Sequence, residues 1–321
     1  MEPLVEIKSL SKRFGPLVAV DDVSFAVDRG EVLGFLGPNG AGKSTTMRMI
    51  TGFLTPSAGT VTVCGHDVVG EAIQARDRIG YLPEGAPLYA DMTAGELLRF
   101  VAGVRSLKGA ALAKRVDWAV GQLGLEPVLG QQIETLSKGF KRRVGFAQAI
   151  LHDPDVLILD EPTDGLDPNQ KHEVRTLIRD MAADKAIIIS THILEEVDAV
   201  CTRAMIIDRG RIVVDCTPGE LAARSRHHNA VVLSVGAAPA DELRLALEVV
   251  QGVAEVEIRS DGATAASCVV IPEAGRAIVS AVSRTLHDKG WEIDELRVES
   301  GRLEDVFRDV TRVPGSGVNP G

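Results

Sequence analysis

Uninterrupted hydrophobic runs recur in the first two thirds of the chain. The clearest are residues 32–36, 156–159 and 186–189, each bounded by charged, polar or glycine residues. Runs of this length without alternation are typical of strands that are buried on both faces of a parallel sheet. Residues 4–8 and 60–64 alternate more nearly between hydrophobic and polar side chains, which predicts strands with one exposed face. The pattern therefore predicts an α/β domain with a parallel-sheet core.

Two further regions differ from this core. Residues from about 84 to 153 have mostly helical periodicity. Beyond Arg224, a polar break at residues 225–229 precedes a second series of short elements. Their predicted order is strand, helix, strand, strand, helix, strand and a last helix, at residues 231–235, 241–250, 253–259, 267–271, 274–289, 292–298 and 303–310. This order predicts a smaller α+β domain, over residues 225–312, that is ferredoxin-like.

Two polar segments have simpler interpretations. His227 and His228 lie in the polar break without metal-ligand partners at useful spacing, and we interpret them as solvated linker residues. Residues 313–321 have the composition of a disordered tail.

Composition restricts the class of protein. The 321 residues carry a formal net charge of −10, which argues against nucleic acid as the main partner. A local basic cluster could contact nucleic acid, but we favour a solvated helix surface or a contact with phosphate or a partner. The cluster contains Lys138, Lys141, Arg142 and Arg143. The four cysteines lack zinc-site or redox spacing and read as the reduced thiols of a cytosolic protein. No hydrophobic run approaches the roughly 18 to 20 residues that a membrane helix needs, and the first residues do not form a signal peptide.

A glycine-rich segment follows the first buried run. Residues 37–44, Gly-Pro-Asn-Gly-Ala-Gly-Lys-Ser, fit the P-loop (Walker A) pattern at every fixed position, between a predicted strand and a predicted helix. Glycines let successive backbone amides converge on phosphate oxygens, and a helix N-terminus adds a favourable dipole. Lys43 is expected to reach the β- and γ-phosphates of a nucleoside triphosphate, and the Ser44 hydroxyl to ligate Mg²⁺. The predicted nucleotide-binding residues of this segment are Gly37, Pro38, Asn39, Gly40, Ala41, Gly42, Lys43, Ser44 and Thr45.

Two carboxylates end the run at residues 156–159. In open α/β sheets, ligands bind at the carboxyl ends of the parallel strands. Asp160 is therefore expected to hold Mg²⁺, directly or through water, and Glu161 to polarise the attacking water. Together with the P-loop, this pair predicts hydrolysis of a nucleoside triphosphate.

Further motifs, in a fixed order, resemble those of a known family. Residues 136–140, Leu-Ser-Lys-Gly-Phe, resemble the LSGGQ signature of ABC-type ATPases. Residues 163–168 resemble the D-loop of that family, and residues 190–192, Ser-Thr-His, its switch-histidine strand. Phe14 matches the aromatic residue that stacks on adenine. The resemblance covers roughly residues 4 to 220 and is carried by five ordered motifs.

The resemblance implies a domain at residues 1–224 with a parallel-sheet core, an antiparallel β subdomain and the helical subdomain at about 84–153. It implies two domains that dimerise head-to-tail, with Ser137 and Gly139 of one subunit facing the γ-phosphate that the other binds. It also implies that His192 senses the γ-phosphate. Because the chain has one P-loop and one signature, we expect a homodimer or a pair with a second ATPase chain. The domain at residues 225–312 is expected to have a regulatory or assembly role.

The chain departs from the family pattern at two places. Lys138 and Phe140 replace the usual glycine and glutamine of the signature, whereas Ser137 and Gly139 remain. Glu84 stands where most members have a glutamine. A carboxylate can ligate Mg²⁺, although it adds negative charge beside the phosphates. The sequence leaves two alternatives open for Glu84. It either ligates Mg²⁺ or turns toward a transmembrane partner.

The tract at residues 81–92 looks most like the ATPases of ABC-2 exporters, which include multidrug, gliding-motility-type and sodium-efflux-type systems. We therefore predict a cytoplasmic ATPase, peripheral on the inner face of the cell membrane. Its ATP-driven dimer closure would power a separate permease that selects the substrate; export over import rests on the family alone. The alternative is a soluble ABC-type ATPase acting on nucleic acid or the ribosome, against which the acidic charge argues. A degraded regulator is countered by intact Lys43, Asp160, Glu161 and His192.

Overall fold

The computed structural model describes residues 2–236, 238–261 and 265–311. The chain forms two compact units, Met1–Cys216 and Thr217–Gly321, and each is described by itself. The predicted tail at residues 313–321 lies outside the described residues. Within the described ranges, no helix combines the length and the hydropathy needed to cross a bilayer.

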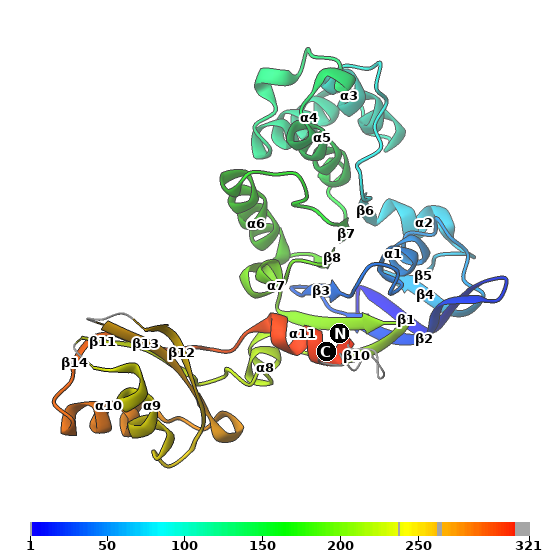
Figure 1. The fold of residues 1–321 in the computed structure, drawn as a ribbon. Helices are drawn as coiled ribbons and strands as arrows, with labels where there is room; N and C mark the ends of the chain where they lie inside the picture. Colours follow the sequence, from blue (N-terminus) through cyan, green and yellow to red (C-terminus); the bar gives the residue numbers. More distant parts are fainter. Residues whose placement is uncertain (1, 237, 262–264, 312–321) are drawn as a thin grey trace. The chain divides into compact units, whose positions relative to one another are not determined.

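A mostly parallel sheet forms the centre of the first unit (Figure 1). Its strands are β3 (Val32–Leu36), β6 (Ile79–Leu82), β7 (Val156–Asp160), β8 (Ala186–Thr191), β9 (Arg203–Asp208) and β10 (Arg211–Cys216). The strand order is β10-β9-β3-β8-β7-β6, and β10 alone in this sheet pairs antiparallel. Every residue of β3, β7 and β8 is buried, as expected for strands covered on both faces. The predicted parallel core is therefore confirmed.

An antiparallel sheet packs beside this core. It contains β1 (Val5–Phe14), β2 (Leu17–Val27), β4 (Ala58–Val63) and β5 (His66–Asp67), in the order β2-β1-β4-β5. Val5, Phe25 and Val61 of this sheet share one hydrophobic cluster with Phe35 of the parallel sheet and Met47 of the first helix. The two sheets and the first helix thus share one hydrophobic core.

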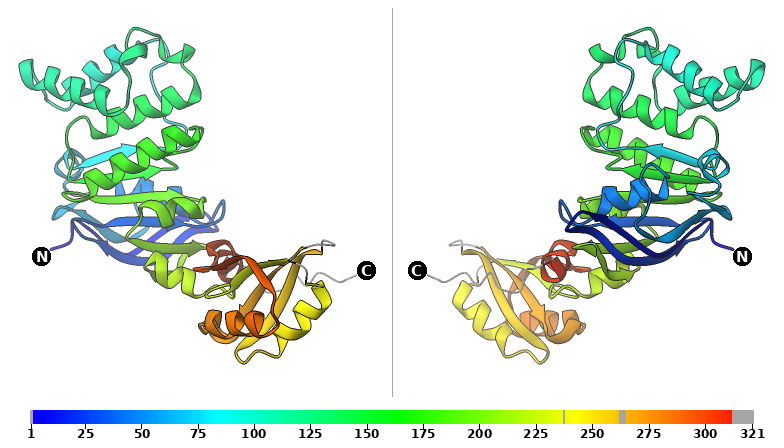
Figure 2. Two further views of the ribbon diagram at one scale, coloured as in Figure 1. Left: turned by 90° about the vertical axis from the view of Figure 1, so that its left-hand side faces the viewer. Right: turned by 90° about the vertical axis from the view of Figure 1, so that its right-hand side faces the viewer.

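The helices of the first unit are α1 (Lys43–Ile50), α2 (Ala72–Asp77), α3 (Ala94–Val104), α4 (Gly109–Gln122), α5 (Lys138–Ile150), α6 (Pro168–Ala182) and α7 (Leu194–Val200), with short 3-10 helices at Glu126–Val128 and Ile133–Thr135. Helices α3, α4 and α5 gather at one end of the unit, beyond the edge strand β6 (Figures 1 and 2). Thr93 starts α3 with a capping box that includes Glu96. The segment predicted to be helical, from about residue 84 to 153, contains this group.

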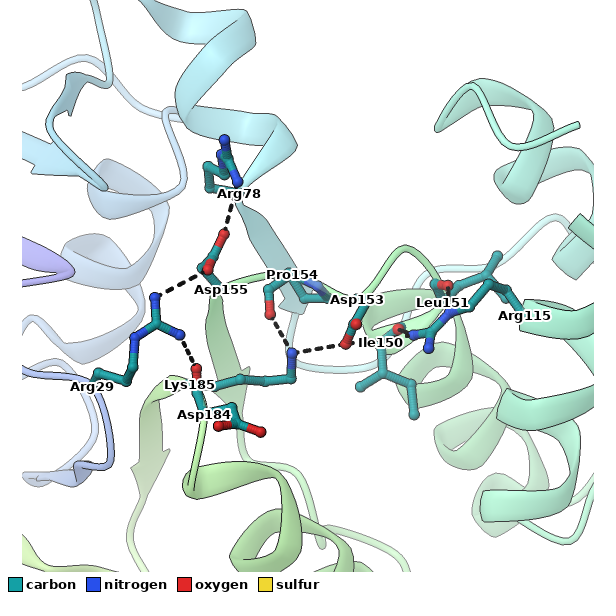
Figure 3. Close-up of polar contacts among 10 residues, drawn as sticks. All are labelled: Arg29, Arg78, Arg115, Ile150, Leu151, Asp153, Pro154, Asp155, Asp184 and Lys185. Carbon is teal, nitrogen blue, oxygen red and sulfur yellow. Dashed lines mark hydrogen bonds and ion pairs between the residues drawn. The ribbon is translucent and has the colours of Figure 1, made fainter. Parts of the chain in front are cut away.

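An ionic network joins the amino-terminal ends of the parallel strands (Figure 3). Asp155, just before β7, accepts hydrogen bonds from Arg29 at 3.3 Å and from Arg78 at 3.1 Å. Arg29 precedes β3 and Arg78 precedes β6. Lys185, just before β8, donates to Asp153 at 2.8 Å. The network therefore fixes four strand starts to one another at the edge opposite the P-loop.

An arginine also fixes the last turn of α5 (Figure 3). Arg115 of α4 donates to the carbonyl oxygens of Ile150 and Leu151, each at 2.9 Å. These carbonyls lie at the helix C-terminus, where no backbone N–H group of the same helix is available to them. The carboxyl end of α5 is thus held by one guanidinium.

The second unit contains α8 (Pro218–Ala223), β11 (Val231–Gly236), α9 (Ala240–Glu248), β12 (Val253–Asp261), β13 (Ala265–Pro272), a 3-10 helix (Glu273–Gly275), α10 (Val279–Asp288), β14 (Glu292–Val298) and α11 (Leu303–Thr311). Its sheet is antiparallel with the order β12-β13-β11-β14, which is the ferredoxin-like arrangement. Helices α9 and α10 share one core with this sheet. The helix predicted from residue 274 begins only at Val279, because Ala274 (φ 47°) and Gly275 (φ 70°) have left-handed backbone.

The polar break differs from its sequence interpretation. The predicted domain boundary at residue 224 follows α8, whereas the structure assigns α8 to the second unit, where it contacts α11. His227 is 2% exposed, and its Nδ1 hydrogen-bonds the carboxylate of Asp305 in α11. The interpretation of His227 as a solvated linker residue is therefore wrong. The covering helix lies about eighty positions later in the chain, so the local composition did not indicate it.

Candidate nucleotide-binding site

The register of three parallel strands gathers the predicted site at one edge. Leu36, the last residue of β3, pairs with Thr191 of β8, and Asp160 of β7 pairs with Ser190 of β8. The next residues along each strand direction therefore emerge side by side: the P-loop after β3, Glu161 after β7 and His192 after β8. This is the carboxyl edge, where open α/β sheets bind ligands.

The backbone of the P-loop requires glycine. Gly42 has φ 112°, and a Cβ atom there would lie 2.6 Å from the carbonyl oxygen of Ala19. A Cβ at Gly37 would lie 2.5 Å from the carbonyl oxygen of Ile207. Gly42 is the N-cap of α1 and makes no side-chain cap hydrogen bond. The first backbone N–H groups of α1 therefore remain available to bind an anion. Asn39 and Gly40, in the loop before them, are exposed.

We expect Gly42→Ala to lower both stability and nucleotide affinity. The change forces a non-glycine residue into a disfavoured conformation, at a cost of about 1–3 kcal/mol, and adds the clash with Ala19. Thermal unfolding and titration with ATP measure the two effects. Gly65→Ala is the matched control, because Gly65 has φ 80° but open space around its Cβ position. Equal losses in the two variants would show that the contact with Ala19 has no role.

Lys43 connects the loop to the acidic side of the site. Its ammonium group donates to the carbonyl oxygens of Gly37 at 2.6 Å and Pro38 at 3.3 Å, and the side chain is buried. Burial lowers the pKa of Lys43, and the charges of Glu161, Asp160 and Glu84 oppose that shift, in this order. The three predicted carboxylates therefore lie near enough to Lys43 for their charges to act on it. The structure brings these four residues together.

Hydrogen bonds fix the two carboxylates that follow β7. Asp160 is 2% exposed and accepts a hydrogen bond from the Ser190 hydroxyl. The backbone N–H of Glu161 donates to the carbonyl oxygen of Ser190 at 3.0 Å. Glu161 has φ 52°, a left-handed conformation. Its carboxylate lies 2.9 Å from Nδ1 of His192, whose side chain is 58% exposed. His192 thus contacts the predicted catalytic carboxylate and is open to a ligand.

The oxygen donors near Lys43 suit Mg²⁺. Ser44 is half-buried at the start of α1, Asp160 ends β7, and Glu84 is exposed in the turn after β6. Among the described residues, no group of three or more His, Cys, Asp or Glu side chains is arranged to hold a metal by itself. Mg²⁺ is usually bound by one or two protein oxygens together with substrate phosphates and water. The donor set fits that mode.

Three predicted residues lie outside this cluster. Phe14 ends β1 and is 46% exposed, with Nζ of Lys12 5.2 Å from its ring centroid. Ser137 is exposed and caps α5, where its hydroxyl accepts from the N–H of Phe140 at 3.3 Å. Gly139 is buried in the first turn of α5. In the described part of the chain, neither Ser137 nor Gly139 hydrogen-bonds the P-loop.

Arg142 was not identified from the sequence. It belongs to the basic cluster interpreted as a solvated or partner-contacting surface, yet it is 5% exposed. Its guanidinium donates to the backbone at the ends of β6 and β7. The helical spacing of Arg142 could have indicated its burial. Arg142 lies on the same face of α5 as the buried residues Gly139, Phe146 and Ala149, at intervals of three and four.

Comparisons with known proteins identify the family of the chain. The chain matches the family model "ABC transporter" over residues 20–164. The Nod factor export ATP-binding protein I of Ralstonia nicotianae is 39% identical over 220 residues, which cover 68% of each chain. The probable multidrug ABC transporter ATP-binding protein YbhF of Escherichia coli (strain K12) is 38% identical over 225 residues, 70% of this chain but 39% of YbhF. The chain thus spans less than half the length of YbhF. A solved structure of an ATP-binding subunit of an ABC transporter superposes with a TM-score of 0.64 and 33% identity, covering 68% of this chain and 91% of that one.

Proposed function

Since the chain belongs to the ATP-binding proteins of the ABC transporters, we propose that it hydrolyses ATP to power a separate membrane permease of an exporter. The observation that carries this proposal is the gathering of Lys43, Glu161 and His192 at the carboxyl edge of one sheet. Export is supported by the names of two relatives, a multidrug and a Nod factor export protein.

The residues of the site have distinct proposed roles. The P-loop amides and Lys43 bind the β- and γ-phosphates. Glu161 accepts a hydrogen bond from the attacking water and polarises it, and His192 orients Glu161 and contacts the γ-phosphate. Ser44, Asp160 and Glu84 would hold Mg²⁺, which neutralises developing charge on the phosphates when it is bound. Phe14 is proposed to stack on the adenine.

We propose that a second subunit completes the site around the γ-phosphate. Ser137 is exposed at the N-terminus of the 13-residue helix α5, where amide groups and the helix dipole favour an anion. We propose that Ser137 and Gly139 contact the γ-phosphate held by a second subunit, in a homodimer or with a second ATPase chain. ATP would then close the pair, and hydrolysis would open it.

We also propose a role for the second unit and a location for the protein. The ferredoxin-like unit has its own hydrophobic core, which supports a regulatory or assembly role separate from the nucleotide site. The protein would lie on the inner face of the cell membrane through its permease.

Affinity purification from detergent-solubilised membranes tests the function. We expect a multi-helix membrane protein to co-purify in comparable amount, together with ATPase activity that depends on Mg²⁺. Co-purification with ribosomes or nucleic acid, and without a membrane protein, would support the alternative class instead.

Glu84→Gln tests the unusual acidic position. If Glu84 ligates Mg²⁺, the Mg²⁺ concentration for half-maximal ATPase activity should rise on the order of 10-fold, as for other lost metal-site contacts. Glu134→Gln is the control, because Glu134 is an exposed carboxylate in a short helix before the signature. Glutamine keeps an oxygen donor, so an unchanged Mg²⁺ dependence in Glu84→Gln would show that the charge of Glu84 has no role in Mg²⁺ binding.

A further inference from the structure

Helix α5 carries a buried charge close to the nucleotide site. Arg142 lies five positions after Ser137, and in the described part of the chain its hydrogen bonds go to backbone carbonyl groups. One acceptor is the carbonyl oxygen of Pro83, at 2.9 Å, in the peptide bond that leads into Glu84. In the described chain the guanidinium has no ion-pair contact, although the charges of Asp160 and of three other carboxylates act on it. Its position is therefore set by those carbonyl groups.

The other acceptors flank the predicted catalytic carboxylate. Nη2 of Arg142 donates to the carbonyl oxygens of both Asp160 and Glu161, and Nε donates to that of Pro162 at 3.4 Å. The peptide bonds on either side of Glu161 are thus bound by one guanidinium. Glu161 has a left-handed backbone, φ 52°, which persists only when its surroundings hold it in place. A planar group with five fixed donors is suited to that task.

We propose that Arg142 is a positioning residue that links the signature helix to the backbone of Glu161 and of Glu84. This inference rests on the proposed ATPase function. It connects the signature contact that α5 makes to the partner subunit with the catalytic carboxylate of the same chain. Ser137 and Arg142 lie on the same rigid helix, five positions apart in sequence. When Ser137 contacts a phosphate held by the partner subunit, any shift of α5 reaches the peptide bonds around Glu161 through Arg142. Hydrolysis in one site then depends on contacts made at the other.

Arg115 of α4, which contacts the opposite end of α5, is a matched control. Arg115 also donates to two backbone carbonyl groups, those of Ile150 and Leu151, but in the last turn of α5 (Figure 3). Both arginines hold α5 in place, whereas Arg142 alone of the two reaches the residues after β7. Arg115→Gln therefore reports the stability of the helix without a direct effect on Glu161.

The experiment uses the full chain and MgATP, with Arg142→Gln, Arg142→Lys and Arg115→Gln. We expect Arg142→Gln to lower kcat about 30- to 100-fold, because small displacements of a positioned catalytic group cost on that order, while KM for ATP changes little. Arg142→Lys keeps the charge but not the fork of donors, so it should restore part of kcat. Arg115→Gln should lower the melting temperature yet keep kcat within about twofold of the wild type.

Two results would overturn the inference. One is a folded Arg142→Gln variant with wild-type kcat; the other is an equal loss of kcat in Arg115→Gln at a similar melting temperature. If Arg142→Gln does not fold, Arg142→Lys decides, since wild-type kcat in that variant would show that the fork of hydrogen bonds is not required. The wild-type protein separates this test from that of the function. Inactivity of the wild type with MgATP refutes the proposed ATPase, whereas an active wild type with an active Arg142→Gln refutes only the role of Arg142.

Discussion

Replacing Glu161 with glutamine is expected to stop steady-state ATP hydrolysis while leaving ATP binding intact. The glutamine keeps the size of the side chain and a hydrogen bond to His192, which lies 2.9 Å from the carboxylate. It cannot act as a general base, a role that contributes typically about 10²- to 10⁴-fold to a rate. ATPase assays measure the loss, and light scattering with ATP in the absence of Mg²⁺ measures the state of association. We expect an ATP-dependent shift from monomer to dimer.

Glu195→Gln is the control for this change. Glu195 is an exposed carboxylate in the first turn of α7, three positions after His192. Its replacement should leave kcat and association unchanged. A Glu161→Gln protein that hydrolyses ATP at the wild-type rate would assign the base to another residue. A Glu161→Gln protein that stays monomeric with ATP would contradict the proposed ATP-driven dimer. A protein that is dimeric with and without ATP would indicate that the second unit forms a permanent dimer contact.

Replacing Lys43 with alanine is expected to remove most of the affinity for ATP. Lys43 is the buried cation of the loop, and each charge-assisted contact it makes to phosphate contributes about 1.5–3 kcal/mol, roughly 10- to 100-fold in affinity. Alanine also removes the lysine contact to the carbonyl oxygen of Gly37, whereas the carbonyl oxygen of Pro38 keeps a hydrogen bond from the N–H of Ala41. Calorimetric titration with ATP measures the loss of affinity.

Lys185→Ala is the matched control, because Lys185 is another largely buried lysine that donates to a carbonyl group, at the opposite edge of the sheet (Figure 3). This variant should unfold at a lower temperature and bind ATP as the wild type does. Wild-type ATP affinity in Lys43→Ala would mean that residues 37–44 are not the phosphate site.

The family and the parallel core were predictable because their signals are local. The P-loop and the pair Asp160–Glu161 each depend on neighbouring residues in the sequence, and the strands before them are continuous hydrophobic runs. The comparisons confirm the family, and the structure confirms that Asp160 ends a buried strand. The element order of the second unit followed from periodicity for the same reason.

What the sequence did not indicate depends on distant segments. Arg142 was assigned to a basic cluster interpreted as a solvated surface or a contact with phosphate or a partner, but it is buried and donates to carbonyl groups of two other elements. His227 was assigned to a linker, but α11 covers it. The left-handed backbone of Glu161 has no signal in residue type, since glutamate rarely adopts it. Tertiary contacts determine the burial of Arg142 and His227 and the backbone conformation of Glu161.

The ionic network before β7 has a consequence for how the sheet responds to salt. One partner of each pair is about half exposed or more, Arg29 at 48%, Arg78 at 54% and Asp153 at 63%, so salt should weaken the ion pairs. The strand starts should nevertheless remain anchored, because Lys185 also donates to the carbonyl oxygen of Pro154 at 2.7 Å and the buried strands β3, β7 and β8 pair through their backbones. Inhibition by moderate salt would then be reversible on dilution, because the sheet that aligns Glu161 and His192 never comes apart.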